Sequence, residues 1–141
     1  MGAPFRHTLL LVEDSQDVRE LMSEIFQEYG LRVIAAVDGL DALAKIENNV
    51  PDVVLTDLRM PNMTGLELAR HLRAHPVFFD IPIAVLSSIV PENLSTATEI
   101  DVFIRKPCSV DYLVKTINQM LLNVLNGIHA QRRQAARRAL N

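Results

Sequence analysis

The sequence predicts a doubly wound α/β fold, in which helices cover both faces of a five-stranded parallel sheet. Two observations carry this prediction. Five short runs along the 141 residues are apolar at every position, which is typical of strands that a parallel sheet buries on both faces. Between most of these runs the apolar residues follow helical spacing. Strands that alternate with helices indicate βαβ units, whose right-handed crossovers wind the chain over both faces of one domain.

The expected strands follow one another along the chain as runs of three or four apolar residues. They are Leu9–Val12, Val33–Ala36, Val53–Leu55, Ile83–Leu86 and Val102–Ile104. In a fold of this kind ligands bind outside the carboxyl ends of the strands. The residues that follow each run are therefore the candidates for chemistry.

The first helix is expected between the first two strands. Ser15 is its predicted N-cap, and Gly30 marks the point where it stops. Apolar residues recur there at positions i, i+3, i+4, i+7 and i+8, which is the spacing of an apolar stripe along a helix. These residues are Val18, Leu21, Met22, Ile25 and Phe26.

Similar apolar stripes predict the other helices. Leu40–Ile46 and Leu66–Leu72 carry the second and third stripes, and Val110–Ile128 carries a long last one. Pro91–Ile100 opens with a proline and holds three β-branched residues, so the fourth helix should be short or irregular. Residues 120–128 are apolar on more than one helix face, which favours a homodimer or a partner helix there over deeper burial.

Charge divides the chain into an acidic body and a basic end. Residues 1–111 hold 9 Lys/Arg and 17 Asp/Glu, whereas residues 112–141 hold 5 Lys/Arg and no acid. The body does not suit nucleic acid, and the basic end has no DNA-binding motif. We therefore expect a domain over residues 1–126 and a basic extension over residues 127–141, which is a solvated tail or, as the alternative, a site for an anionic partner.

Composition excludes several classes of protein. The single cysteine, Cys108, excludes an internal disulfide framework and a multi-cysteine zinc site, and we expect a buried, inert thiol. No apolar stretch approaches the roughly 18 residues of a membrane span, and Met1–His7 lacks the apolar region of a signal peptide. We therefore expect a cytoplasmic protein that does not bind membranes.

Residues able to hold a metal ion or a phosphate follow four of the expected strands. Clustered carboxylates repel one another unless a cation neutralises them, and Mg²⁺ is commonly held by one or two carboxylates with phosphate oxygens. A lysine would pair with a phosphoryl group, and a serine would donate to it. Taken singly, each residue has a structural alternative, such as capping the next helix. The residues are Glu13 and Asp14, Thr56 and Asp57, Ser87 and Ser88, and Arg105 and Lys106.

Four segments, taken in order, carry a resemblance to a known family. Asp57–Gly65 matches the run D-x-x-M-P-x-M-x-G at every fixed position. Over residues about 7 to about 126 the chain resembles the receiver domain of two-component response regulators. The other three segments are Leu10–Asp14, Pro82–Ser88 and Arg105–Pro107.

The resemblance implies phosphorylation at Asp57. This residue is similar to the aspartate that accepts a phosphoryl group from the phosphohistidine of a partner kinase, with its carboxylate as the nucleophile. Glu13 and Asp14 resemble the acidic pair that binds Mg²⁺ together with Asp57 and the backbone carbonyl of Arg59.

The resemblance also implies roles on the last two strands. Lys106 is similar to the lysine that pairs with Asp57 and then with its phosphate, and the Lys106–Pro107 peptide bond is expected to be cis. Ser87 resembles the switch hydroxyl that moves to a phosphate oxygen. Phe103 resembles the switch aromatic, although it could equally be a plain core residue.

Two further expectations concern connecting segments. Gly65 is expected to adopt a backbone conformation barred to other residues, and Met63 to fill the core. Residues 99–101, Glu-Ile-Asp, replace the small Gly-Ala pair usual in the family, so we expect the face that signals to partners to differ.

We therefore expect a stand-alone response regulator that is not a conventional enzyme. A histidine kinase or phosphotransfer protein would phosphorylate it, and a downstream protein would bind its two states differently. Three alternatives remain: a receiver-like scaffold that acts without phosphorylation, a flavodoxin-like electron carrier, and a phosphatase with an aspartyl nucleophile. Glu13 and Asp14 would repel a flavin phosphate, and Arg59 stands where the phosphatase needs an acid.

Overall fold

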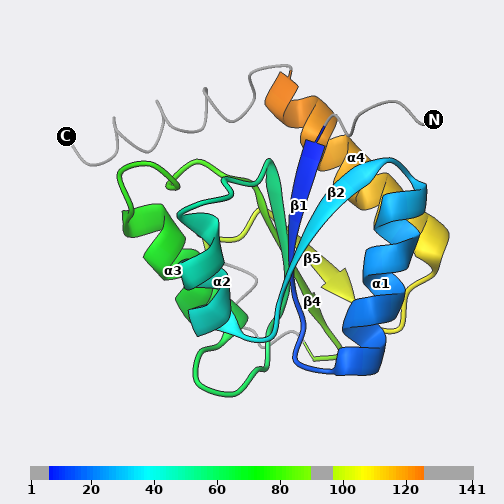
Figure 1. The fold of residues 1–141 in the computed structure, drawn as a ribbon, viewed down its shortest axis with the longest axis horizontal. Helices are drawn as coiled ribbons and strands as arrows, with labels where there is room; N and C mark the ends of the chain where they lie inside the picture. The colour runs from blue at the N-terminus through cyan, green and yellow to red at the C-terminus, as the bar shows by residue number, and fades with distance from the viewer. Residues whose placement is uncertain (1–6, 90–96, 126–141) are drawn as a thin grey trace.

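Five parallel strands form the centre of the molecule in the order β2-β1-β3-β4-β5 (Figure 1). The structure is a computed structural model, which describes residues 7–89 and 97–125. All five expected runs lie within strands, and the five-stranded parallel sheet is confirmed. The strands are β1 (His7–Val12), β2 (Leu31–Ala36), β3 (Val53–Asp57), β4 (Ile83–Ser87) and β5 (Val102–Arg105).

Helices cover both faces of the sheet, as expected (Figure 1). Helices α2 (Gly39–Ile46) and α3 (Gly65–Ala74) lie on one face, and α1 (Gln16–Glu28) and α4 (Val110–Leu125) lie on the other. Each face has its own buried apolar cluster, because neighbouring strand residues point to opposite sides. Leu10 and Val54 belong to the first cluster, and Leu9 and Leu55 belong to the second.

Helix α1 begins and ends where the sequence predicts. The Ser15 hydroxyl accepts a hydrogen bond from the Val18 N–H, and Gly30 has a positive φ of 89° just after the helix. Met22 and Phe26 are buried, whereas Leu21, which belongs to the same apolar stripe in the sequence, is 58% exposed. A helix on a flat sheet buries a narrow stripe, and Leu21 lies outside it.

Helix α2 shows the same effect. Asp38 caps it by accepting from the Asp41 N–H, and the helix buries Ala42 and Ile46. Leu40 is 54% exposed because it lies on the opposite side of the helix from those residues.

The connection from β4 to β5 lies partly outside the described residues, and so does most of the expected fourth helix. Its described end, residues 97–101, is not helical. Arg73 of α3 anchors this end. Its guanidinium donates to the backbone carbonyls of Phe79, Ile81 and Glu99, at 3.0, 2.6 and 3.1 Å, and pairs with Asp101 at 2.8 Å. The residues that replace the usual Gly-Ala pair thus tie α3 to the start of β5.

Helix α4 buries one face against the sheet, including Ile117 and Met120. Leu122 is 51% exposed and Val124 is also exposed, so the predicted second apolar face exists within the described part of this helix. The homodimer stays a prediction, because Ile128 and the basic extension lie outside the described residues. None of the helices in the described residues has the length and apolar character of a membrane span.

Candidate functional site

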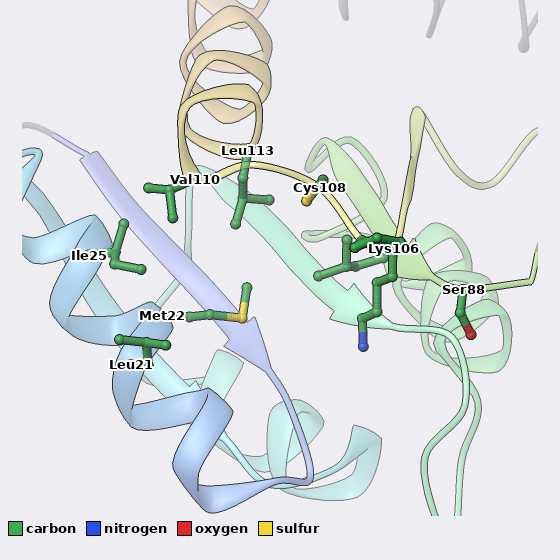
Figure 2. A pocket seen from close by; sticks show the side chains of 10 residues that line it. Leu21, Met22, Ile25, Ser88, Lys106, Cys108, Val110 and Leu113 are labelled. Carbon is green, nitrogen blue, oxygen red and sulfur yellow. The ribbon is translucent and has the colours of Figure 1, made fainter.

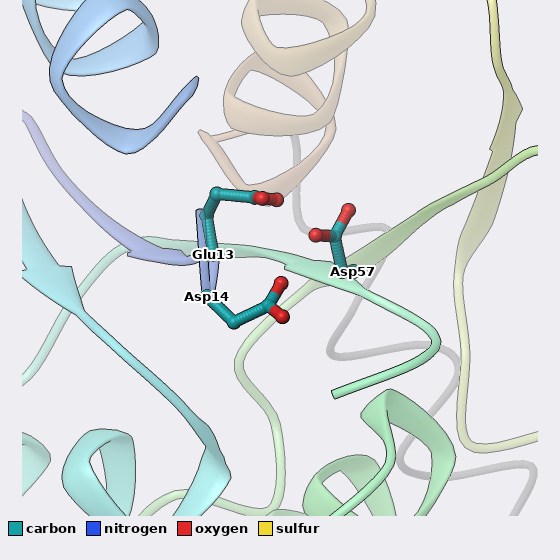
Figure 3. Close-up of side chains that lie close together, drawn as sticks. All are labelled: Glu13, Asp14 and Asp57. Carbon is teal, nitrogen blue, oxygen red and sulfur yellow. The ribbon is translucent and has the colours of Figure 1, made fainter. Parts of the chain in front are cut away.

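The carboxyl ends of β1 and β3 place three acidic side chains together. The two strands pair in parallel up to Val12 and Thr56, so the residues that come next, Glu13 and Asp57, lie side by side. Glu13, Asp14 and Asp57 each offer a carboxylate oxygen, and these oxygens lie within 4.8 Å of one another (Figure 3). Glu13 and Asp57 are buried and Asp14 is exposed. The cluster is therefore open to solvent on the side of Asp14.

Lys106, just after β5, completes this cluster. Its Nζ lies 2.8 Å from Oδ1 of Asp57. The contact is electrostatic, since the buried Oδ1 has no hydrogen-bond partner of suitable geometry among the described residues. A buried carboxylate oxygen without such a partner needs a further positive group or donor. The Lys106–Pro107 peptide bond is cis.

The charges of this cluster are unbalanced, with three carboxylates against one ammonium group. Burial first, and then the neighbouring Asp57 carboxylate, raise the pKa of Glu13 to about 7. Burial alone would lower the pKa of Lys106, but the carboxylates of Asp57, Glu13 and Asp14 outweigh it and raise that pKa. An added cation would relieve the repulsion among the acids.

The loop after β3 depends on Gly65 for a reason other than the expected one. Among the described residues only Gly30 is a glycine with positive φ, so the predicted special backbone conformation is wrong. A Cβ at Gly65 would instead collide with the backbone carbonyl oxygen of Asp57 and lie 3.2 Å from the Leu58 Cα. Gly65 is required because the start of α3 passes directly against the backbone of Asp57.

Two other contacts fix this loop. Met63 is buried, as predicted, and packs where a side chain at Gly39 would collide with it. Asn62 has a positive φ of 70°, and its Nδ2 donates to Oδ2 of Asp38 at 3.1 Å. Sequence reasoning missed Asn62, whose tolerance of positive φ was the available signal. Arg59 lies in the same loop with its side chain exposed, and its carbonyl as a metal ligand stays a prediction.

Ser87 lies at the end of β4 and is buried. Its hydroxyl donates to the carbonyl of Ile89 at 2.6 Å and accepts from the N–H of the same residue at 3.3 Å. The hydroxyl is thus bonded to its own loop. Phe103 is half-buried and packs against the cluster beneath α2 and α3, and Ser88 is exposed. The switch roles of Ser87 and Phe103 stay predictions.

An open pocket of about 510 Å³ lies beside the acidic cluster (Figure 2). Leu21, Met22 and Ile25 of α1 line one wall, and Val110 and Leu113 of α4 line the other, so the pocket is almost entirely apolar. Ser88 and Lys106 also line it, and Nζ of Lys106 lies 2.8 Å from Asp57. Cys108 also lines it and is half-buried, less buried than predicted.

Comparison with known proteins gives the same assignment as the geometry. The family model of the response regulator receiver domain matches residues 9–118. The Gliding motility regulatory protein of Myxococcus xanthus is 39% identical over 89 residues, which are 62% of this chain and 12% of that protein. Protein PilG of Pseudomonas aeruginosa is 28% identical over 112 residues, which are 77% of this chain and 83% of PilG. The chain thus spans a small part of the first relative and most of the second.

Solved structures share the fold. The receiver domain of a signal transduction histidine kinase from Syntrophus aciditrophicus superposes with a TM-score of 0.78 at 29% identity, covering 84% of this chain and 92% of that one. The order of the strands and the acidic cluster beside a lysine both agree with the family match. The chain belongs to the response regulator receiver domain family of two-component signalling.

Proposed function

We propose that this chain is a phosphorylation switch that accepts a phosphoryl group on Asp57 from the phosphohistidine of a partner kinase. The observation that carries the proposal is the arrangement around Asp57: a buried carboxylate at the end of a central strand, 2.8 Å from Lys106 and next to two further acids. Its Oδ1 has no hydrogen-bond partner among the described residues and is held only by the ion pair with Lys106.

The residues present fit a magnesium ion. The donor set is all oxygen, three carboxylates lie within 4.8 Å of one another, and one lysine leaves them unbalanced. Glu13, Asp14 and Asp57 would hold the ion, with the carbonyl of Arg59 as the fourth protein ligand. When bound, it supplies positive charge that offsets the phosphoryl oxygens during in-line transfer.

The transfer itself uses the carboxylate of Asp57. One of its oxygens forms a bond to phosphorus while the phosphorus–nitrogen bond of the donor breaks. The electron pair of that bond stays on the imidazole nitrogen, which ends neutral or takes up a proton. Lys106 stays charged because its pKa is raised, so its ammonium can follow charge from the carboxylate to the phosphoryl oxygens. Water later attacks phosphorus, releases inorganic phosphate and restores the carboxylate.

On this proposal, the change between the two states begins with a movement of the Ser87 hydroxyl. To reach a phosphoryl group on Asp57, it must leave the carbonyl of Ile89, which it now contacts at 2.6 Å. Its move would free Ile89, which is 54% exposed, and change the surface near β4. A downstream protein that binds one arrangement better than the other would shift the population. On this proposal the chain is a switch and not an enzyme acting on an external substrate.

The apolar pocket beside Lys106 supports a protein donor. A donor helix that brings its histidine to Asp57 must pass over α1 and the start of α4, where Leu21 and Val110 are exposed at the rim. Apolar residues of the donor would cover this rim while the histidine faces Asp57. The downstream target remains unassigned.

The decisive experiment is intact-mass measurement after incubation with Mg²⁺ and acetyl phosphate. The wild type should gain one phosphoryl group, Asp57→Asn should gain none, and both should stay unmodified in EDTA. Asp52→Asn is a matched control, because this aspartate lies at the far end of the sheet, where it accepts from the Thr8 N–H at 2.7 Å. A histidine kinase serves as a second donor. A wild type that accepts from neither donor would favour a scaffold that acts without phosphorylation.

A further inference from the structure

Arg19 contacts the backbone of the acidic pair. It lies in the first turn of α1, and its side chain reaches back to the end of β1. Its Nη1 donates a hydrogen bond of 2.8 Å to the backbone carbonyl of Glu13, six residues earlier in the chain. The phosphotransfer chemistry described above makes no use of this residue.

The contact completes the support of one short turn. The N–H of Glu13 donates to the carbonyl of Ala36 on β2 at 3.0 Å, which extends the sheet ladder by one residue. The Glu13 carboxylate accepts from the N–H of Ser15 at 3.1 Å. The carbonyl that Arg19 binds belongs to the peptide group joining Glu13 to Asp14. The two acidic side chains branch from the Cα atoms on either side of this peptide group (Figure 3), so its orientation contributes to where both carboxylates point.

The hydrogen bond from Arg19 is made to the backbone of this turn and not to a carboxylate. The pKa of Glu13 responds to burial and to Asp57, Ser15 and Lys106. The charge of Arg19 is felt instead at Asp41: burial there raises the pKa, but the N–H of Val37, then Lys45 and Arg19, lower it overall.

We propose that Arg19 is a positioning residue for the divalent cation and, through it, for phosphorylation of Asp57. Its hydrogen bond holds the Glu13–Asp14 peptide group in the orientation that directs both carboxylates toward Asp57. This inference rests on the proposed function, because it concerns the same acidic site. Residues that orient metal ligands commonly change metal affinity 10- to 100-fold when they are replaced.

The test is the affinity for Mg²⁺ alone, measured by titration while following backbone amide signals in NMR spectra. Arg19→Met keeps most of the side-chain volume and removes the donor, and should weaken Mg²⁺ binding about tenfold. Arg19→Lys keeps a charged donor and should recover most of the affinity. Arg32→Met is the matched control, because this arginine of β2 makes an exposed 3.4 Å hydrogen bond to Asn49, away from the site. It should bind Mg²⁺ as the wild type does.

A second measurement separates positioning from stability. With acetyl phosphate, Arg19→Met should need about ten times more Mg²⁺ for half-maximal phosphorylation and should approach the wild-type rate at saturating Mg²⁺. Amide signals that keep the wild-type pattern away from the turn confirm that the variant is folded.

Each contrary outcome overturns a defined statement. Equal Mg²⁺ affinity of the wild type and Arg19→Met overturns the role of Arg19 and leaves the proposed function intact. Arg19→Lys as weak as Arg19→Met overturns the hydrogen bond as the cause. A wild type that neither binds Mg²⁺ nor accepts phosphate overturns the proposed function, and this inference with it.

Discussion

Gly65→Ala tests whether the close approach of α3 to Asp57 is essential. Gly65 is the first residue of α3, where alanine would ordinarily stabilise a helix by up to about 1 kcal/mol. The structure predicts the opposite sign, because the new Cβ would collide with the backbone carbonyl of Asp57, which cannot rotate away as a side chain can. Overpacking of this kind costs about 1–3 kcal/mol. We expect the free energy of unfolding to fall by about 1–2 kcal/mol, because alanine also stabilises by reducing the entropy of the unfolded chain.

Gly30→Ala is the matched control. Its φ of 89° strains an alanine by about 1–2 kcal/mol, but no atom lies within 4 Å of the added Cβ. Urea unfolding followed by circular dichroism measures both stabilities, and intact mass measures the rate of phosphorylation by acetyl phosphate.

Phosphorylation separates the two variants. Gly65→Ala must displace Asp57 or the start of α3, so its phosphorylation should be at least about tenfold slower, since displacements of about 1 Å have effects of this size or larger. Gly30→Ala should react at the wild-type rate, because Gly30 lies at the far end of α1. A Gly65→Ala variant that is as stable and as reactive as the wild type would refute the steric argument.

Three further predictions concern other parts of the molecule. The pKa of Glu13 rises from 4.5 to about 7 on folding, so the folded state holds a proton there that the unfolded state releases. In EDTA, the free energy of unfolding should therefore fall by up to about 3 kcal/mol as pH rises from about 4.5 to above 7. Urea unfolding at several pH values measures this fall, and Glu13→Gln should remove it; an unchanged fall in the variant contradicts the assignment. Leu21→Ala should slow phosphotransfer from a kinase about fivefold, since Leu21 is 58% exposed and its burial would contribute about 1 kcal/mol. Acetyl phosphate should phosphorylate Leu21→Ala at the wild-type rate. Leu40 is 54% exposed on α2, so Leu40→Ala is the control and should behave as the wild type with both donors. Equal kinase rates for the two variants would contradict a donor surface at the pocket. Arg73→Met should destabilise by about 3 kcal/mol in urea unfolding, because it removes hydrogen bonds to three carbonyls and the ion pair with Asp101. A loss below about 1 kcal/mol would show that these contacts are weak.

The sheet was predictable because its central strands, such as β3 and β4, are buried on both faces. Runs such as Val53–Leu55 have no polar position, which a half-exposed strand would require. Topology then places the acids. Glu13 directly follows β1 and Asp57 ends β3, and these two strands are parallel neighbours. This part of the candidate site needs no knowledge of side-chain packing.

The remainder depends on tertiary contacts that no local pattern carries. Helical periodicity marks apolar residues but not how wide a stripe the sheet buries, so it could not indicate that Leu21 and Leu40 are exposed. Gly65 was recognised as necessary for the wrong reason, since the nearby backbone of Asp57 is visible only in the fold. Asn62 bonds to a residue 24 positions away, which spacing along the chain could not indicate.

Strand pairing has a consequence for how this chain tolerates mutation. Parallel neighbours in a sheet lie about 4.7–4.9 Å apart, and the acids of β1 and β3 inherit that separation from their backbones. Substitutions in either apolar cluster therefore change how many chains are folded before they change the distance between Glu13 and Asp57. A destabilised variant should lose activity in proportion to its unfolded fraction, while its folded molecules react at the normal rate. Substitutions in the interior therefore leave the geometry of the acidic site in the folded molecules largely unchanged.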